Sequence, residues 1–556
     1  MPANYLQILA ALQDSFPPAL GEAEEDTRLS SALQHALAQL DGLPAAGGLL
    51  GESRTPDYTA ARRACMPDEG SSLEAVTRSL VDALEGSFNW NHPGNQSQMA
   101  ARPTLASILA VLLPAITNPN LCSDETSRRV AEIEVRVAAI ASELIGYDAD
   151  RSAGLFTFGG TGAMMYGVKI GMEKALPGCH AGGLKSDTVL LTSDECHYCA
   201  LNVAAWLGIG QDNVIRVATE SDHAVRVDEL EAAARRALTA GKTISAIVAT
   251  LGTTDAFGID DLAAIHTMRE RLVDQYNLDY HPHIHADAAS GWAWSVLGDY
   301  NFQDNPLEFG EPTAAALAQA VDRIRHLRLA DSVAIDFHKT GFTPYVSSLV
   351  LLRERADLEA IKRQADLMPY LYQAGDYHPG QLTLETTRSA AGPLAAWANL
   401  LLFGKQGLRV LLGHAMEMTR AFRQAIDADE SLSVLNRDNV GPVTLFRAYP
   451  EGIPAAVALE SEIDNPSASE QLRAMNDFNR RIFEQAHANA LAGEGLSVSL
   501  TECRGLTRCG EPITALKCYS LSPTADASQM RQVVSDLLRA RAEVERQGSF
   551  TLVAAE

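Results

Sequence analysis

Short apolar runs rich in β-branched residues alternate with helical stretches through the middle of the chain. The runs are GLFTFGG, DTVLLTS, NVIRVAT, ISAIVATLGTT, HIHADAA, SVAIDFH and SSLVLLR. Ahead of them, ETSRRVAEIEVRVAAIASELIGYD places its apolar residues at helical spacing. Apolar strands separated by helices are typical of a mostly parallel sheet that is buried on both faces. The pattern therefore predicts an α/β domain over residues 101–390, with a seven-stranded sheet and helices on both faces.

The two flanking regions follow other patterns. Residues 1–100 are polar, with helical periodicity broken by glycine and proline. Residues 391–556 begin with a long helical segment and continue with the strand-like VTLFRAY and LSVSLTE and a closing helix, DASQMRQVVSDLLRARAEVERQ. We therefore expect a helical N-terminal segment and a smaller C-terminal α+β domain. Within that domain, EGIPAAVALESEIDNPSASE reads as a loop or insertion.

Composition narrows the possible partners and compartments. The chain has 70 acidic and 45 basic residues, a formal net charge of −25 and no basic run, so nucleic acid and anionic membrane surfaces are not expected partners. No apolar run reaches the roughly 18–20 residues of a membrane span, and the N-terminus does not resemble a signal peptide. Eight scattered cysteines indicate reduced thiols rather than a disulfide framework, which predicts a cytoplasmic location.

One cysteine pair has the spacing of a metal site. Cys196 and Cys199 form a C-x-x-C motif around His197. A structural zinc site needs a second ligand pair at suitable spacing, and Cys503 and Cys509 are too far apart to supply it convincingly. No metal is expected.

The first predicted strand runs into a glycine-rich turn, Gly159-Gly160-Thr161-Gly162, ahead of a helix. Such a turn offers free backbone N–H groups and the positive end of the helix dipole to an anion. The motif matches neither the Walker nor the G-x-G-x-x-G pattern, and alone a plain tight turn is equally compatible with it.

Four further side chains follow other predicted strands: His197, Asp287, Ala289 and Lys339. A lone aspartate at a strand end is more often a cap, and a lone histidine is more often structural. Together, however, they suit a flat, phosphorylated pyridine aldehyde. A lysine forms a Schiff base with an aldehyde, and a buried carboxylate keeps a pyridine nitrogen protonated. The set predicts pyridoxal 5'-phosphate (PLP), with the turn as its phosphate site.

Two sequence motifs support this cofactor. HADAASG spans residues 285–291 and DFHK spans 336–339, and Lys339 lies 52 positions after Asp287. FNWNHPG, FTFGGTGAM, HYCALNVAAWLG, VATLGTTDAFGIDDL and LETTRSAAGPLAAW fall in a consistent order between about residues 88 and 400. The chain resembles the group II PLP-dependent amino acid decarboxylases, which have the aspartate aminotransferase fold (fold type I).

The resemblance implies a role for each cofactor-binding position. Lys339 would hold the internal aldimine and Asp287 would pair with the pyridine nitrogen. His197 and Ala289 would cover the two faces of the ring. The remaining positions would contact the phosphate or the ring substituents: Gly160, Thr161, Gly162, Thr254 and His338.

The resemblance also implies substrate contacts and a homodimer. Tyr370 resembles a loop tyrosine that protonates the quinonoid carbon and reaches the neighbouring subunit's active site, with Tyr372 as the alternative. Arg388 resembles an arginine that grips the substrate carboxylate, for which its planar fork is suited. Asn91 and His92 would line the substrate side.

The implied reaction is decarboxylation of an L-amino acid to the corresponding amine through the Lys339 aldimine and a quinonoid. Another fold type I activity, such as a carbon–carbon lyase or an oxidative deaminase, is the first alternative, and a catalytically silent scaffold is the second. The intact Lys339, Asp287 and His197 disfavour the scaffold. Aromatic, acidic and diamino acids all stay open as substrates.

Overall fold

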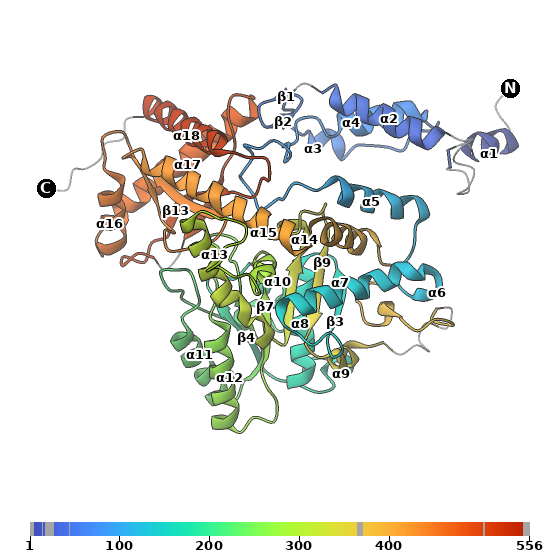
Figure 1. Ribbon diagram of the computed structural model, residues 1–556, viewed down its shortest axis with the longest axis horizontal. Helices are drawn as coiled ribbons and strands as arrows, with labels where there is room; N and C mark the ends of the chain where they lie inside the picture. The colour runs from blue at the N-terminus through green and yellow to red at the C-terminus, as the bar shows by residue number, and fades with distance from the viewer. Residues whose placement is uncertain are drawn as a thin grey trace.

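The computed structural model describes residues 5–13, 15–16, 27–43, 45–363, 368, 371–503 and 506–548. Figure 1 shows a central sheet with helices around it, and a C-terminal part built on α15, α17 and α18 beside it. The N-terminal helices α1 to α4 lie along one side, with α1 projecting furthest from the rest of the chain (Figure 1).

The central sheet has seven strands in the order β3-β9-β8-β7-β6-β4-β5. β9 runs antiparallel to β3 and β8, and the other neighbouring pairs are parallel. All seven apolar runs of the sequence form these strands, so the predicted mostly parallel sheet is confirmed. The strands are β3 (Ala153–Thr157), β4 (Thr188–Ser193), β5 (Val214–Val217), β6 (Thr243–Thr250), β7 (His283–Asp287), β8 (Ser332–Asp336) and β9 (Ser348–Leu352).

Helices connect and cover these strands. The predicted helix ahead of the sheet is present, but it is divided at Arg128, where φ is 46°. A left-handed backbone at a non-glycine residue ends α6 and starts α7 in a new direction. The helices are α6 (Asp124–Ser127), α7 (Arg129–Ile145), α8 (Gly160–Ala175), α9 (Cys179–Gly182), α10 (Cys199–Trp206), α11 (Val227–Thr239), α12 (Leu262–Tyr276), α13 (Glu311–Ile324) and α14 (Phe337–Thr340).

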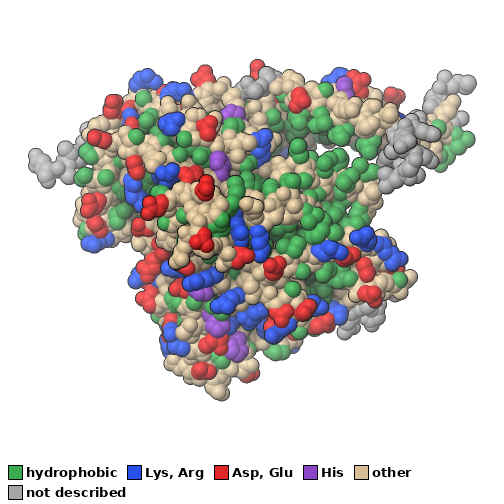
Figure 2. All heavy atoms as spheres, in the orientation of Figure 1, with side chains coloured by type: hydrophobic (Ala, Val, Ile, Leu, Met, Phe, Trp, Pro, Cys, Tyr) green, Lys and Arg blue, Asp and Glu red, His purple; other side chains and the backbone are tan. Residues whose placement is uncertain are grey.

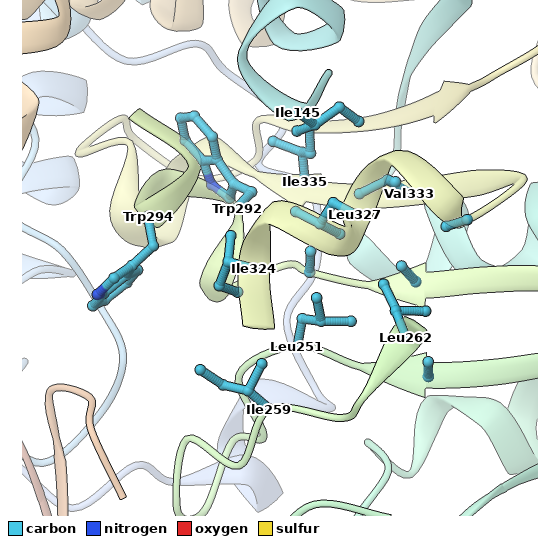
Figure 3. Packing of buried hydrophobic residues seen from close by; sticks show 14 of the residues in the cluster. Ile145, Leu251, Ile259, Leu262, Trp292, Trp294, Ile324, Leu327, Val333 and Ile335 are labelled. Carbon is cyan, nitrogen blue, oxygen red and sulfur yellow. The ribbon is translucent and has the colours of Figure 1, made fainter. Parts of the chain in front are cut away.

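A hydrophobic core fills the space between the sheet and these helices. Figure 3 shows Ile145 of α7 and Trp292 beside Ile335 of β8, and all three side chains are almost fully buried. Fully burying a side chain of this size contributes roughly 1.5–3 kcal/mol each to folding. This packing fixes the strands whose carboxyl ends carry the candidate residues.

The C-terminal part contains an antiparallel sheet of order β10-β11-β13-β12. VTLFRAY and LSVSLTE contribute β11 and β12, as predicted. The segment read as a loop instead contains α16, because AAVALESEID consists mainly of good helix formers and follows Pro454 at the N-cap. The elements are α15 (Ala391–Asp427), β10 (Leu432–Val434), β11 (Val443–Ala448), α16 (Ala455–Asp464), α17 (Ser469–Leu491), β12 (Ser499–Cys503), β13 (Ile513–Tyr519) and α18 (Ala527–Gln547).

The N-terminal region is helical, as predicted, apart from one short strand pair. No described helix combines the length and apolarity that a membrane crossing requires. The elements are α1 (Tyr5–Gln13), α2 (Arg28–Asp41), β1 (Ala45–Ala46), β2 (Leu49–Leu50), α3 (Tyr58–Ala61), α4 (Leu73–Asp82) and α5 (Leu105–Thr117).

Candidate active site

A cavity of about 200 Å³ lies where the carboxyl ends of β4, β6, β7 and β8 meet the start of α8. Ligands of α/β sheets bind at this edge because the loops that follow parallel strands converge there. Eight of the predicted positions line it: Gly160, Thr161, His197, Thr254, Asp287, Ala289, His338 and Lys339. Cys199, Thr250, Gly252, Ser290 and Asp336 also line it.

Lys339 enters the cavity from α14, the single helical turn that follows β8. Its Nζ lies 3.1 Å from Oδ2 of Asp336. Burial alone would lower the pKa of Lys339, but the carboxylates of Asp336 and Asp287 outweigh it and raise the pKa above its usual value. Both carboxylates therefore favour the ammonium form of the lysine, and Asp336 is in direct contact with it.

The glycine-rich turn forms one end of the cavity. Gly159 has φ 116°, which glycine adopts easily, and α8 begins at the next residue. A Cβ on Gly160 would lie 3.0 Å from Oδ2 of Asp336, so the missing side chain keeps the helix start open. Thr161 is exposed and lines the cavity, whereas Gly162 is buried against Thr157 and Phe158 and does not.

His338 lies beside this turn with one ring nitrogen already bound. Its Nδ1 is 3.1 Å from the carbonyl oxygen of Ser347, and its Nε2 is 3.6 Å from Oδ2 of Asp336. Burial lowers the pKa of His338, while Asp336 and the Ser347 backbone partly oppose that effect. The contact with Ser347 fixes the ring, and Nε2 lies on the side of the cavity residue Asp336.

The other end of the cavity carries Asp287, Ala289 and His197. Asp287 is the last residue of β7, and its Oδ1 accepts a hydrogen bond from the Ala289 backbone N–H at 3.2 Å. The Nδ1 of His197 accepts one from the Cys199 backbone N–H, also at 3.2 Å. Burial lowers the pKa of His197, against the raising effect of Asp287. This end therefore offers a carboxylate, a flat neutral ring and a small apolar side chain.

The lining set suits PLP group by group. The glycine turn at a helix start suits a phosphate, the carboxylate of Asp287 suits a protonated ring nitrogen, and the amine of Lys339 suits an aldehyde. The space that a Cβ on Gly160 would fill is part of the same fit.

Sequence comparison identifies a known domain. Residues 56–298 match the pyridoxal-dependent decarboxylase conserved domain. This part of the chain is therefore a pyridoxal-dependent decarboxylase domain. It is 24% identical over 497 residues to an L-2,4-diaminobutyrate decarboxylase of Acinetobacter baumannii, with 86% of this chain and 85% of that protein covered. It is 28% identical over 385 residues to the enzyme of the same name from Rhizobium meliloti, with 69% and 70% covered.

A solved structure agrees with this fold. The glutamate decarboxylase domain of diaminobutyrate-pyruvate transaminase and L-2,4-diaminobutyrate decarboxylase from Vibrio parahaemolyticus superposes with a TM-score of 0.72 at 18% identity. The match covers 96% of this chain and 99% of that one. The superposition shows a shared fold, and the domain match over residues 56–298 makes the chain a PLP-dependent decarboxylase.

Arg388, which was expected to contact the substrate, is not among the residues that line the cavity. Its Nη1 and Nη2 lie 3.0 and 2.5 Å from the two carboxylate oxygens of Glu134, and both side chains are buried. It also donates to the carbonyl oxygens of Leu121 and Phe156. The guanidinium is therefore bound by protein groups. The sequence did not predict this contact, because the residues around Arg388 give no sign of a buried glutamate on α7.

The remaining predicted substrate contacts also lie outside the lining. The backbone N–H of Asn91 donates to Asn89, and Nδ1 of His92 accepts from the Gly94 backbone. Their segment reaches the cavity indirectly. The Gln96 carbonyl accepts from the backbone of Tyr519, whose hydroxyl donates to the carbonyl of the cavity residue Thr254.

Of the two candidate proton donors, Tyr370 lies outside the described residues. Tyr372 is described, and its ring lies 5.2 Å from that of His378. It is not part of the cavity lining. Asp336, the first residue of DFHK, is one of the cavity residues that the sequence motifs did not predict.

Proposed function

We propose that the cavity around Lys339 is the PLP site of this decarboxylase and that its substrate is a small L-diamino acid of the 2,4-diaminobutyrate class. The observation that carries the cofactor site is the convergence of Lys339, Asp287, His197 and the Gly160–Thr161 turn in one cavity. The diamino acid is favoured by the L-2,4-diaminobutyrate decarboxylases of Acinetobacter baumannii and Rhizobium meliloti, whose aligned regions cover most of the chain.

The residues that line the cavity would each bind a different group of the cofactor. Lys339 would bind the aldehyde of PLP through Nζ, and Gly160, Thr161 and His338 would hold its phosphate. Asp287 would keep a proton on the ring nitrogen. PLP held in this way would supply an acceptor for the electron pair that departing CO₂ leaves behind.

His197 and Ala289 complete the site by fixing the orientation of the ring. His197 is held by its hydrogen bond from Cys199, and Ala289 is 6% exposed. By keeping the ring of bound PLP in one orientation, these two residues would help to select loss of CO₂ over loss of another group. Arg388 is assigned to the framework of the site through Glu134 rather than to the substrate.

We further propose that two copies of the chain form the working enzyme. Several large apolar side chains are exposed on α5 and beside the cavity, and Figure 2 shows hydrophobic side chains gathered over α5 and the chain around it. They include Leu105, Leu109, Leu113, Phe158, Tyr345 and Val346. Exposed apolar surface of this extent marks an interaction site, and the ring of Tyr345 lies only 4.8 Å from that of His338. A second copy would therefore close a wall of the cavity.

Product analysis tests the activity and the substrate together. The purified full-length chain, supplied with PLP, is incubated with the twenty standard amino acids and with 2,4-diaminobutyrate, and products are identified by mass spectrometry. We expect 1,3-diaminopropane and CO₂ from 2,4-diaminobutyrate at the highest kcat/KM. A preference for an aromatic or acidic amino acid contradicts the substrate class. Release of ammonia and an aldehyde instead of an amine favours an oxidative deaminase.

A further inference from the structure

A second carboxylate, Asp336, sits in the cavity closer to Lys339 than the acid that pairs with the ring nitrogen. Among the described residues, Asp336 is the one carboxylate within 4.0 Å of Lys339 Nζ, at 3.1 Å. Its Oδ1 accepts a hydrogen bond of 2.6 Å from the hydroxyl of Ser348, and it is 3% exposed. The side chain is therefore fixed in place and shielded from water.

The carboxylate of Asp336 lies at the start of α8. A Cβ on Gly160 would meet Oδ2 at 3.0 Å and Oδ1 at 3.1 Å. The positive end of a helix dipole stabilises a carboxylate in that position. Asp287 belongs to the neighbouring strand β7, and its Oδ1 is bound to the backbone of Ala289 instead. The two acids therefore face Lys339 from different elements and have different partners.

We propose that Asp336 is the counter-ion of Lys339 whenever the lysine nitrogen is not bonded to the cofactor, and that it holds the freed ammonium at the α8 end of the cavity. This inference rests on the proposed function, because that function gives Lys339 its bond to the cofactor. Asp336 acts through the lysine, so it is a positioning residue.

The proton count of substrate entry supports this role. The substrate arrives as an ammonium, its nitrogen replaces that of Lys339 on the cofactor carbon, and the lysine nitrogen leaves. All three protons of the entering ammonium end on the lysine nitrogen, so atoms and charge balance. The new ammonium forms beside Asp336, where an opposite charge disfavours loss of the proton. A neutral lysine would be free to attack the same carbon and displace the substrate again.

Other groups face Lys339, and each belongs to a different element. They are Asp287 on β7, His197 after β4, Cys199 on α10, His338 on α14, Tyr345 in the segment before β9 and Tyr519 on β13. Asp287 and the ring nitrogen of the bound cofactor are expected to neutralise each other. Of the two carboxylates that face Lys339, Asp336 then remains to balance a lysine released during turnover.

Acylation of Lys339 measures its protonation directly. The full-length chain is stripped of cofactor and treated with acetic anhydride over a range of pH, and the peptide carrying Lys339 is quantified by mass spectrometry. The exposed Lys185 of the same digest serves as internal reference. At pH 8 we expect Asp336→Asn to acylate Lys339 at least about tenfold faster than wild type, because a nearby opposite charge moves a pKa by roughly 1 to 3.

Two controls separate charge from structure. Ser348→Ala removes the hydroxyl that binds Asp336 but leaves the carboxylate, so it should change the acylation rate by a few-fold at most. If Asp336→Asn does not fold, the wild-type profile decides: Lys339 should need a higher pH than Lys185 for half-maximal acylation. Equal profiles for Lys339 and Lys185, or a folded Asp336→Asn protein that acylates like wild type, overturn the proposal.

Cofactor trapping distinguishes failure of this inference from failure of the proposed function. Wild-type chain is incubated with PLP and reduced with borohydride, and the modified peptide is located. Modification of Lys339 supports the proposed function whatever the acylation shows. Absence of modification at Lys339 refutes the proposed function and with it the role of Asp336.

Discussion

The guanidinium of Arg388 and the carboxylate of Glu134 form a buried pair, with Nη1–Oε2 at 3.0 Å and Nη2–Oε1 at 2.5 Å. Glu134 also accepts from the backbone N–H of Phe156 and from the hydroxyl of Tyr377. One carboxylate on α7 therefore joins β3, which leads into the phosphate turn, to the segment just after Tyr370. The charge-assisted hydrogen bonds of this pair hold these segments of the site together.

Breaking this pair should destabilise the protein. Arg388→Met leaves the buried carboxylate of Glu134 without its cation, which costs on the order of 3–5 kcal/mol. We expect a large drop in the midpoint of urea unfolding, and a smaller drop for Arg388→Met combined with Glu134→Gln than the two single changes would give together. If Arg388 instead gripped the substrate, Arg388→Met would raise KM and leave the urea midpoint where it was.

Removing the charge of Asp287 should affect turnover far more than cofactor binding. Asp287→Asn keeps the shape and the acceptor for the Ala289 backbone, but it no longer holds a proton on the ring nitrogen. We expect kcat to fall on the order of 100-fold or more, a loss similar to that of a key electrostatic group in other enzymes. Cofactor content by absorbance is measured alongside. Turnover close to wild type with cofactor bound would refute the role of Asp287.

The side chains at the strand ends of the site were predictable because each follows an apolar run. Parallel strands bring their carboxyl ends, and therefore these side chains, together. Lys339, Asp287 and His197 therefore line one cavity, as expected, although they are far apart in the sequence. Arg388 could not be placed in the same way, because its partner Glu134 lies 254 residues earlier and lacks any local signature. A buried ion pair depends on packing between elements, which hydrophobic periodicity does not report.

The pairing within DFHK shows a second limit of the sequence. The motif places Asp336, His338 and Lys339 within four positions, but it does not reveal which way each side chain turns. In the structure, Asp336 ends β8 and α14 begins at the next residue, so the chain folds Lys339 back onto Asp336. The helical spacing of i and i+3, rather than the strand spacing of the preceding residues, creates this contact.

Two buried histidines in β7 should make the protein sensitive to acid. Nε2 of His283 and Nδ1 of His285 both lie 2.8 Å from the hydroxyl of Ser332. Burial lowers their pKa values to about 4 and about 3. Below pH 6.5 these histidines become protonated in the unfolded chain but stay neutral in the native protein. The free energy of unfolding therefore falls as pH falls. Each histidine should account for about 2–3 kcal/mol between pH 6.5 and 4.5.

Urea unfolding at several pH values checks this. His285→Asn should lose less stability than wild type between pH 6.5 and 4.5, whereas His180→Asn, at an exposed position, should follow the wild-type curve. Burial raises the pKa of Asp260 to about 7, which has the opposite pH dependence, but this contribution cancels in the comparison. A wild-type slope in His285→Asn would contradict the assignment.

The proposed dimer depends on apolar side chains of α5. Leu109 is 55% exposed and lies among the exposed leucines of that helix. Leu109→Glu places a charge in the proposed interface, so we expect a monomer by light scattering and a lower kcat, because the cavity wall near Tyr345 stays open. Val457→Glu on α16 is the matched control, since Val457 is 65% exposed and lies in the C-terminal part. Dimers of equal stability in both variants would exclude α5 from the interface.

The identity of the proton donor can be settled by comparing the two tyrosines directly. Tyr370→Phe removes the hydroxyl of the proposed donor, so protonation of the substrate carbon should slow and part of the product should become aldehyde. Tyr372 is packed against His378, and its hydroxyl lies close to the position of a Cβ on Gly380, so Tyr372→Phe should leave the product amine unchanged. Mass spectrometry of the products, with cofactor content measured in parallel, reads out both variants. Diversion to aldehyde in Tyr372→Phe alone would transfer the role to that residue and require its ring to leave the His378 contact during turnover.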